Sequence, residues 1–277
     1  MHFRLSAGLR SFTDLVIAMH LPVGLSLAAI YGMVERTLGQ RPDERYVLFL
    51  ILAGAGGYTA LRLYHLHAQR DCLRRLYRKY FLYFLIYMAL LAVAALFAGL
   101  PYLRRYPHRW IWPVILFVFY NLKSGIKWLS WREIGWLKVL IVAFVWAWLT
   151  VVLPAGSLDT ARRMLFWTVW LWVLLLIIPF DMRDVLWDDQ SLRTLPRLFK
   201  EKTPWAAAVL SLAAILLTVF MPASLLCRLS WWAGISATFG AILLSRRQRG
   251  FYFTALGVES IPFWTALLMY LLCGTGM

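Results

Sequence analysis

Residues 178–196 read IPFDMRDVLWDDQSLRTLP and lie between two long apolar runs, 165–178 and 205–221. The chain has thirteen acidic residues, and four of them fall within these nineteen positions. A charged side chain at the end of a membrane span is costly to keep there, so acids in this place indicate a functional site. The stretch and its flanks therefore predict both a membrane-spanning fold and the position of a site within it.

Three of the four acids share a helical spacing. Asp181, Asp184 and Asp188 fall at i, i+3 and i+7, which places them on one face of a helix. Carboxylates this close repel one another unless a cation or a basic partner lies between them. Oxygen ligands suit a hard cation such as Mg²⁺, which is commonly completed by substrate phosphates. The simpler alternative is a helix end whose Asp and Arg pair at a solvated surface, and the shared face favours the site.

The composition predicts an all-α integral membrane protein. Of 277 residues, 62% are hydrophobic and 15% are charged, and the mean hydropathy is +0.67. A soluble domain cannot bury that much apolar surface. The net charge of +16 would indicate nucleic acid in a soluble protein. In a membrane protein it reflects topology and contact with anionic lipid head groups or phosphates, so we expect membrane lipids and no nucleic acid as partners.

Nine apolar runs predict nine transmembrane helices within a single domain, residues 1–277. The distribution of Lys and Arg over alternate loops predicts the orientation. Nineteen of the 29 basic residues lie on the side of the amino terminus and of the loops after spans two, four, six and eight. This bias predicts a multi-pass protein of the cytoplasmic (inner) membrane, with those loops cytoplasmic and the carboxyl terminus outside. The predicted spans are 12–34, 46–68, 80–100, 109–123, 136–153, 161–180, 204–221, 231–245 and 252–273.

Residues 181–188, followed by Arg193 and Thr-Leu-Pro, resemble the second aspartate-rich motif of the UbiA-type membrane prenyltransferases. In that family a D-x-x-D-x-x-x-D pattern is followed closely by a basic residue and Thr-Leu-Pro. The resemblance implies nine transmembrane helices around a central cavity. It also implies transfer of a prenyl group from a polyprenyl diphosphate to an aromatic or other membrane-soluble acceptor, with Mg²⁺ held between two aspartate-rich cytoplasmic loops. Asp181, Asp184 and Asp188 would be the catalytic metal ligands, and Arg193 would contact the substrate.

The segment Tyr120-Asn-Leu-Lys123 is similar to the same family. Its members often carry Tyr-x-x-Lys at the end of the fourth span, with the Lys close to the diphosphate. The resemblance therefore implies that Tyr120 and Lys123 bind the substrate, since a Lys ammonium is a compact charge suited to phosphate. A Lys at a helix end is otherwise more often a topology residue that extends toward water.

The first aspartate-rich motif departs from the family pattern. The family has N-D-x-x-D-x-x-x-D at the end of the second span, and the matching residues here are 63–71. Only Asp71 keeps its acid, and His67 stands in an acid's place four residues earlier. These two share a helix face and could together hold a cation, although a His near a membrane interface is usually a hydrogen-bonded helix-end residue. Basic residues follow, and the guanidinium groups of Arg74 and Arg75 can bind phosphate directly.

Two functions follow as expectations. The leading one is a Mg²⁺-assisted prenyltransferase. The alternative is a catalytically degenerate family member that binds an anionic lipid, a diphosphate or a protein partner, because the loss of a metal could remove catalysis and preserve binding.

The remaining polar residues indicate less. The cysteines Cys72, Cys227 and Cys273 are far apart in the chain and form no CxxC, so they predict neither a metal site nor a disulfide framework, and packing is their expected role. Asp14 and His20 lie inside the first apolar run, where polar groups usually face the interior of the bundle.

Overall fold

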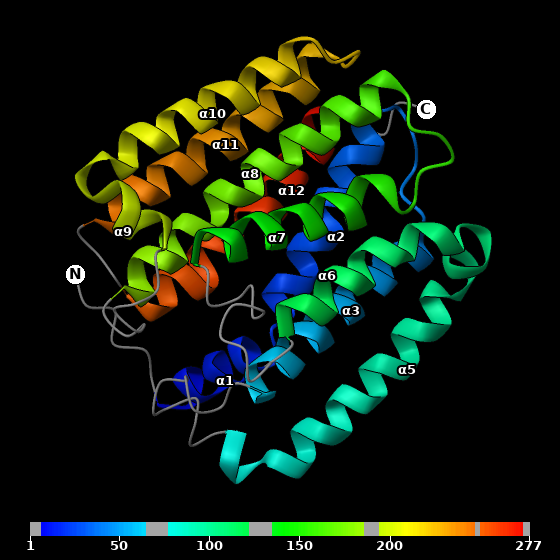
Figure 1. The fold of residues 1–277 in the computed structure, drawn as a ribbon, viewed down its shortest axis with the longest axis vertical. Helices are drawn as coiled ribbons and strands as arrows, with labels where there is room; N and C mark the ends of the chain where they lie inside the picture. Colours follow the sequence, from blue (N-terminus) through cyan, green and yellow to red (C-terminus); the bar gives the residue numbers. More distant parts are fainter. Residues whose placement is uncertain (1–6, 65–76, 122–134, 186–193, 247–249, 274–277) are drawn as a thin grey trace.

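The computed structural model describes residues 7–64, 77–121, 135–185, 194–246 and 250–273, and every regular element among them is helical. Figure 1 shows the helices packed side by side in one bundle. The α-helices are α1 (Ala7–Ala18), α2 (Leu21–Thr37), α3 (Glu44–Tyr64), α5 (Phe81–Arg105), α6 (Ile111–Asn121), α7 (Gly135–Ala147), α8 (Thr160–Asp184), α9 (Leu195–Phe199), α10 (Thr203–Val219), α11 (Leu225–Ser245) and α12 (Ile261–Cys273). Two short 3-10 helices, η2 (Pro107–Trp110) and η5 (Lys200–Lys202), and two π-helical turns, η4 (Trp148–Val152) and η6 (Phe253–Val258), complete the described elements.

The prediction of a helical, multi-pass membrane protein is confirmed. Six of the described helices are long and apolar enough to cross a membrane, and a seventh span results if the bent pair of α1 and α2 is counted as one. The α3 helix has 21 residues but is not among these, and α6 has 11 described residues. Each predicted span overlaps a helix in chain order, whereas nine membrane crossings stay a prediction.

The outer faces of the bundle are apolar. Along α10 the exposed large side chains recur at helical spacing, so they form one stripe that the other helices leave uncovered. Such a stripe suits the hydrocarbon of a bilayer, because the helix satisfies its own backbone hydrogen bonds. The stripe consists of Trp205, Val209, Leu212, Leu216 and Phe220.

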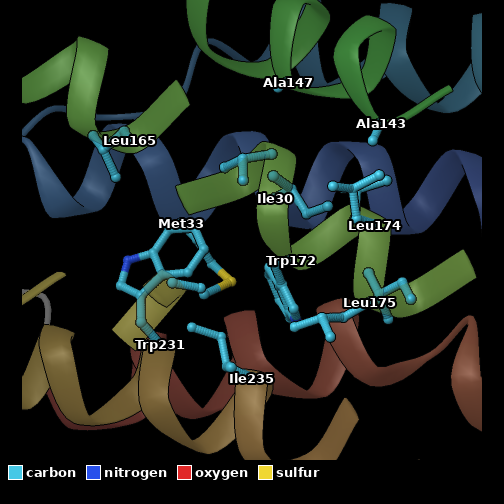
Figure 2. Packing of buried hydrophobic residues seen from close by; sticks show 14 of the residues in the cluster. Ile30, Met33, Ala143, Ala147, Leu165, Trp172, Leu174, Leu175, Trp231 and Ile235 are labelled. Carbon is cyan, nitrogen blue, oxygen red and sulfur yellow. The ribbon is translucent and has the colours of Figure 1, made fainter. Parts of the chain in front are cut away.

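The largest buried cluster joins α2, α7, α8, α10, α11 and α12 (Figure 2). At its centre the rings of Trp172 and Trp231 meet edge to face, with 5.4 Å between their centroids. Each buried indole also satisfies its N–H group, because Trp172 donates to Thr238 Oγ1 and Trp231 donates to Thr37 Oγ1, both at 2.9 Å. This core fixes α8, the helix that carries the acidic stretch.

The first apolar run is broken, which the sequence analysis did not predict. His20 adopts a left-handed backbone conformation with φ 51° and ψ 28°, and the axes on either side of it differ by 60°. The physical reason is Pro22, which has no N–H group to donate to the carbonyl of Ala18 one turn earlier. The hydroxyl of Tyr77 donates to the Ala18 carbonyl instead, at 2.7 Å.

Both polar residues of the first run have partners within the bundle. His20 is 8% exposed and its Nε2 lies 3.5 Å from the hydroxyl of Tyr77. Asp14 accepts a hydrogen bond from the hydroxyl of Tyr252, at 2.6 Å. The expectation that these groups face the interior is confirmed for His20, and Asp14 is half-buried.

Two glycines set the distance between α2 and α3. A Cβ atom on Gly24 would overlap the backbone carbonyl of Ile51, and one on Gly54 would lie 2.8 Å from the Cα of Gly24. Small residues allow such close backbone approach between membrane helices. This crossing positions α3 as one wall of the cavity described below.

Candidate functional site

The acidic stretch begins inside the last turn of α8, and its first acid is buried. Asp181 is 2% exposed, and its Oδ1 accepts from Nζ of Lys138 at 3.4 Å. A buried carboxylate needs such a partner, because an uncompensated charge in a low-dielectric interior costs several kcal/mol. Lys138 comes from α7, one turn after that helix begins. The sequence analysis did not single out Lys138, although its position inside the apolar run 136–153 was a signal that it needed an acidic partner.

Asp184 is paired with the residue next to it. Nε and Nη2 of Arg183 donate to the two carboxylate oxygens of Asp184 at 2.6 and 2.9 Å, which is the bidentate geometry that Arg favours. Nη1 of the same guanidinium donates to Thr254 Oγ1 at 2.7 Å. The guanidinium carbon of Arg183 also lies over the rings of Phe180 and Phe251, 5.4 and 5.5 Å from their centroids. Arg183 thus links the end of α8 to the η6 turn.

Basic partners therefore relieve the predicted repulsion at Asp181 and Asp184, the two acids of the stretch that the structure describes. Two of the three predicted metal ligands are described, and each has a cation from the protein itself. Among the described residues no group of three His, Cys, Asp or Glu could hold a metal ion. Because Asp184 uses both oxygens on Arg183, the described carboxylates do not by themselves fit Mg²⁺. The third predicted ligand, Asp188, and the predicted pair His67 and Asp71 lie outside the described residues, so magnesium binding by the complete stretch stays a prediction.

The end of α8 is also joined to the segment that follows it. Nη2 of Arg197 donates to the carbonyl of Val185 at 2.8 Å. A carbonyl in the last turn of a helix lacks an intrahelical partner, and a basic side chain is a common substitute. Lys138, Arg183 and Arg197 thus all contact the described beginning of the acidic stretch, between Asp181 and Val185.

An apolar cavity of about 170 Å³ lies between α2, α3, α6 and α7. Tyr120 lines this cavity, so one of the predicted substrate-binding residues is placed at its wall. The other four, Lys123, Arg74, Arg75 and Arg193, lie outside the described residues. Further lining residues are Leu27, Leu50, Gly54, Gly57, Tyr58, Leu61, Leu116, Phe117, Ile141, Val142, Val145, Trp146 and Leu149.

The cavity and the ion pair share one helix. On α7, Lys138 is followed by Ile141, Val142 and Val145 at i+3, i+4 and i+7, which is the spacing of a single helix face. Lys138 reaches Asp181, and the three apolar residues line the cavity. Trp146 and Tyr58 also line the cavity, and Nε1 of Trp146 donates to the hydroxyl of Tyr58 at 3.1 Å. The polar atoms of these two residues are thus paired with each other. The same face of α7 therefore joins the charged pair of Lys138 and Asp181 to the apolar cavity next to it.

Comparison of the chain with known protein families, with curated proteins and with solved structures finds no match in any of the three.

Proposed function

We propose that the protein is a UbiA-type membrane prenyltransferase, which transfers a prenyl group from a polyprenyl diphosphate to a membrane-soluble acceptor. The observation that carries the proposal is the single face of α7, which joins the charged pair of Lys138 and Asp181 to the apolar cavity. A polyprenyl diphosphate has the same division into an anionic head and an apolar tail. The motif resemblance of residues 181–196 and of Tyr120 to Lys123 supports the same substrate class.

The residues of the chain have separate roles in this reaction. The bond between the allylic carbon and the diphosphate oxygen breaks, and its electron pair leaves with the diphosphate. Cationic side chains stabilise that developing charge, which is where electrostatic catalysis acts most strongly. Lys138 is the candidate for this role among the residues that the structure describes. The sequence predicts four more: Lys123, Arg74, Arg75 and Arg193. The acceptor then attacks the allylic carbon and loses a proton. Meanwhile the apolar cavity excludes water from the allylic carbocation.

Asp184→Asn is expected to lower kcat/KM for a labelled prenyl diphosphate about 100-fold, the scale of losing one preorganised electrostatic group. Without its carboxylate, Arg183 loses the partner that fixes its guanidinium against Thr254. The measurement is turnover in nanodiscs with Mg²⁺ and a panel of acceptors. Glu44→Gln, an exposed acid at the start of α3, is the matched control and should leave turnover unchanged. An absence of turnover with every acceptor, together with unchanged substrate binding in Asp184→Asn, would count against the proposal.

A second candidate function is binding without transfer. The ion pairs of Asp181 with Lys138 and of Asp184 with Arg183 favour it, because both carboxylates already have protein cations. A binding protein of this kind retains its affinity for a prenyl diphosphate, or for an anionic lipid, when EDTA removes divalent metal. If EDTA abolishes binding, metal-independent binding is wrong and the transferase is favoured.

The cavity itself can be tested at Gly57. This residue lines the cavity, and a Cβ atom added to it would meet no other atom within 4 Å. Gly57→Leu is therefore expected to fill the slot without straining the fold, and to weaken prenyl diphosphate binding at least about tenfold, or about 1.4 kcal/mol. Gly240→Leu, on α11 and equally open, is the control. Unchanged affinity in a folded Gly57→Leu protein would show that the tail binds elsewhere.

A further inference from the structure

Cys227 and Cys273 are distant in the chain but lie at the same end of the bundle, the end away from Asp181. The last turn of α2 contacts both α11 and α12 there. Thr37 Oγ1 accepts from Nε1 of Trp231 on α11, at 2.9 Å, and the guanidinium of Arg36 lies 4.5 Å from the ring centroid of Tyr270 on α12. Because Arg36 and Thr37 are neighbours, these contacts place Trp231 and Tyr270 at the same level of the bundle.

Each cysteine is one helical turn beyond that level, toward the same end. Cys227 precedes Trp231 by four residues, and Cys273 follows Tyr270 by three. The helices α11 and α12 are consecutive spans packed against each other, so they run in opposite directions (Figure 1). One turn toward the start of α11 and one turn toward the end of α12 therefore lie in the same direction along the bundle, so Cys227 and Cys273 are at the same level.

The two thiols are close enough to interact. The Cys227 side chain is among the groups that act on the Cys273 thiol, and both cysteines are free thiols in the structure. Ser224 caps the start of α11 by accepting from the backbone N–H of Cys227 at 3.3 Å, which fixes the backbone of Cys227 at this end of the bundle. A cysteine that only fills space in a core does not require a second thiol beside it.

We propose that Cys227 and Cys273 are a redox pair that closes to a disulfide and links α11 to α12. This inference is independent of the proposed function, because the pair lies at the end of the bundle away from Asp181. The predicted orientation places this end outside the cytoplasm, where disulfides form and persist.

The oxidant is a small-molecule or protein disulfide, and the reaction is two successive exchanges. Cys273 is partly exposed and Cys227 is 5% exposed, so the oxidant reaches Cys273 first. The Cys273 thiolate attacks one sulfur of the oxidant, forms a mixed disulfide and releases one thiol. The Cys227 thiolate then attacks the Cys273 sulfur, which forms the internal disulfide and releases the second thiol. The protein loses two hydrogen atoms and two electrons, and the oxidant is reduced to two thiols.

The test counts reactive thiols in the full chain. Membranes containing the protein are treated with oxidised glutathione, quenched in acid, denatured and labelled with a polyethylene glycol maleimide. The chain has three cysteines, so we expect one label after oxidation, on Cys72, and three labels after reduction. The Cys72→Ser variant should carry two labels after reduction and none after oxidation. Intact mass separates an internal disulfide from a glutathione adduct, since only the adduct adds mass.

Three outcomes would overturn the proposal. The first is retention of all three thiols after oxidation. The second is a stable glutathione adduct on Cys273 that Cys227 does not resolve. The third is a disulfide that maps to Cys72 and disappears in Cys72→Ser. Cys227→Ser is the matched variant that leaves Cys273 without its partner, so Cys273 should form only the adduct.

Discussion

Arg162→Ala is expected to lower the free energy of unfolding by about 3–5 kcal/mol, the usual cost of removing one partner of a buried ion pair. Nη1 and Nη2 of Arg162 donate to the two oxygens of Glu35 at 3.0 and 3.3 Å, and Nη2 also donates to Gln40 Oε1 at 2.8 Å. Both charged residues are 5% exposed. The truncation therefore leaves the Glu35 carboxylate buried without its cation.

The measurement is thermal or denaturant unfolding in a mild detergent. Arg163→Ala is the matched control, because the neighbouring side chain is exposed and donates to the backbone carbonyl of Leu158. The double variant Glu35→Leu with Arg162→Leu should recover much of the loss, since an apolar pair needs no compensation. Equal stability of Arg162→Ala and Arg163→Ala would show that the pair contributes nothing.

Gly24→Val is expected to destabilise the protein by about 1–3 kcal/mol or more, the range measured for overpacked cores. Its new Cβ atom would overlap the Ile51 carbonyl, which is backbone and cannot rotate away. The helices α2 and α3 must then separate, and both of them line the apolar cavity. We therefore expect weaker prenyl diphosphate binding as well as a lower melting temperature.

Gly32→Val, on the same helix, isolates the effect of packing from that of helix propensity. A Cβ atom there meets no other atom within 4 Å, while the loss of a flexible glycine is the same. A Gly24→Val protein as stable as Gly32→Val would contradict the close crossing of α2 and α3.

Much of the fold was predictable because apolar runs have the length of a membrane span. The run predicted at 161–180 is α8, Thr160–Asp184, and the run predicted at 252–273 is matched by η6 and α12. The run predicted at 231–245 corresponds to α11, which begins earlier, at Leu225. The prediction began too late because Arg228 interrupts the apolar pattern. That guanidinium bonds the carbonyl of Met221 at 2.8 Å, so its charge is accommodated at the helix start. This contact joins α11 to the turn before it, and the apolar pattern alone does not indicate it.

The site was predictable only in part, for a similar reason. The position of Asp181 at the end of an apolar run indicated where polar chemistry would lie. It did not indicate Lys138 as the partner, because that pairing depends on how α7 packs on α8. Nor could Cys227 and Cys273 be paired from spacing, since their proximity depends on how α11 and α12 pack and in which direction each runs.

The break at His20 has a consequence for the order in which the chain assembles during synthesis. The carbonyl that Pro22 leaves open is satisfied by Tyr77, 59 residues after Ala18, and Asp14 on α1 waits for Tyr252, 238 residues later. A ribosome delivers these partners in sequence, so α1 is made well before the residues that fix its position. The final position of α1 is therefore set only after Tyr252 has been made.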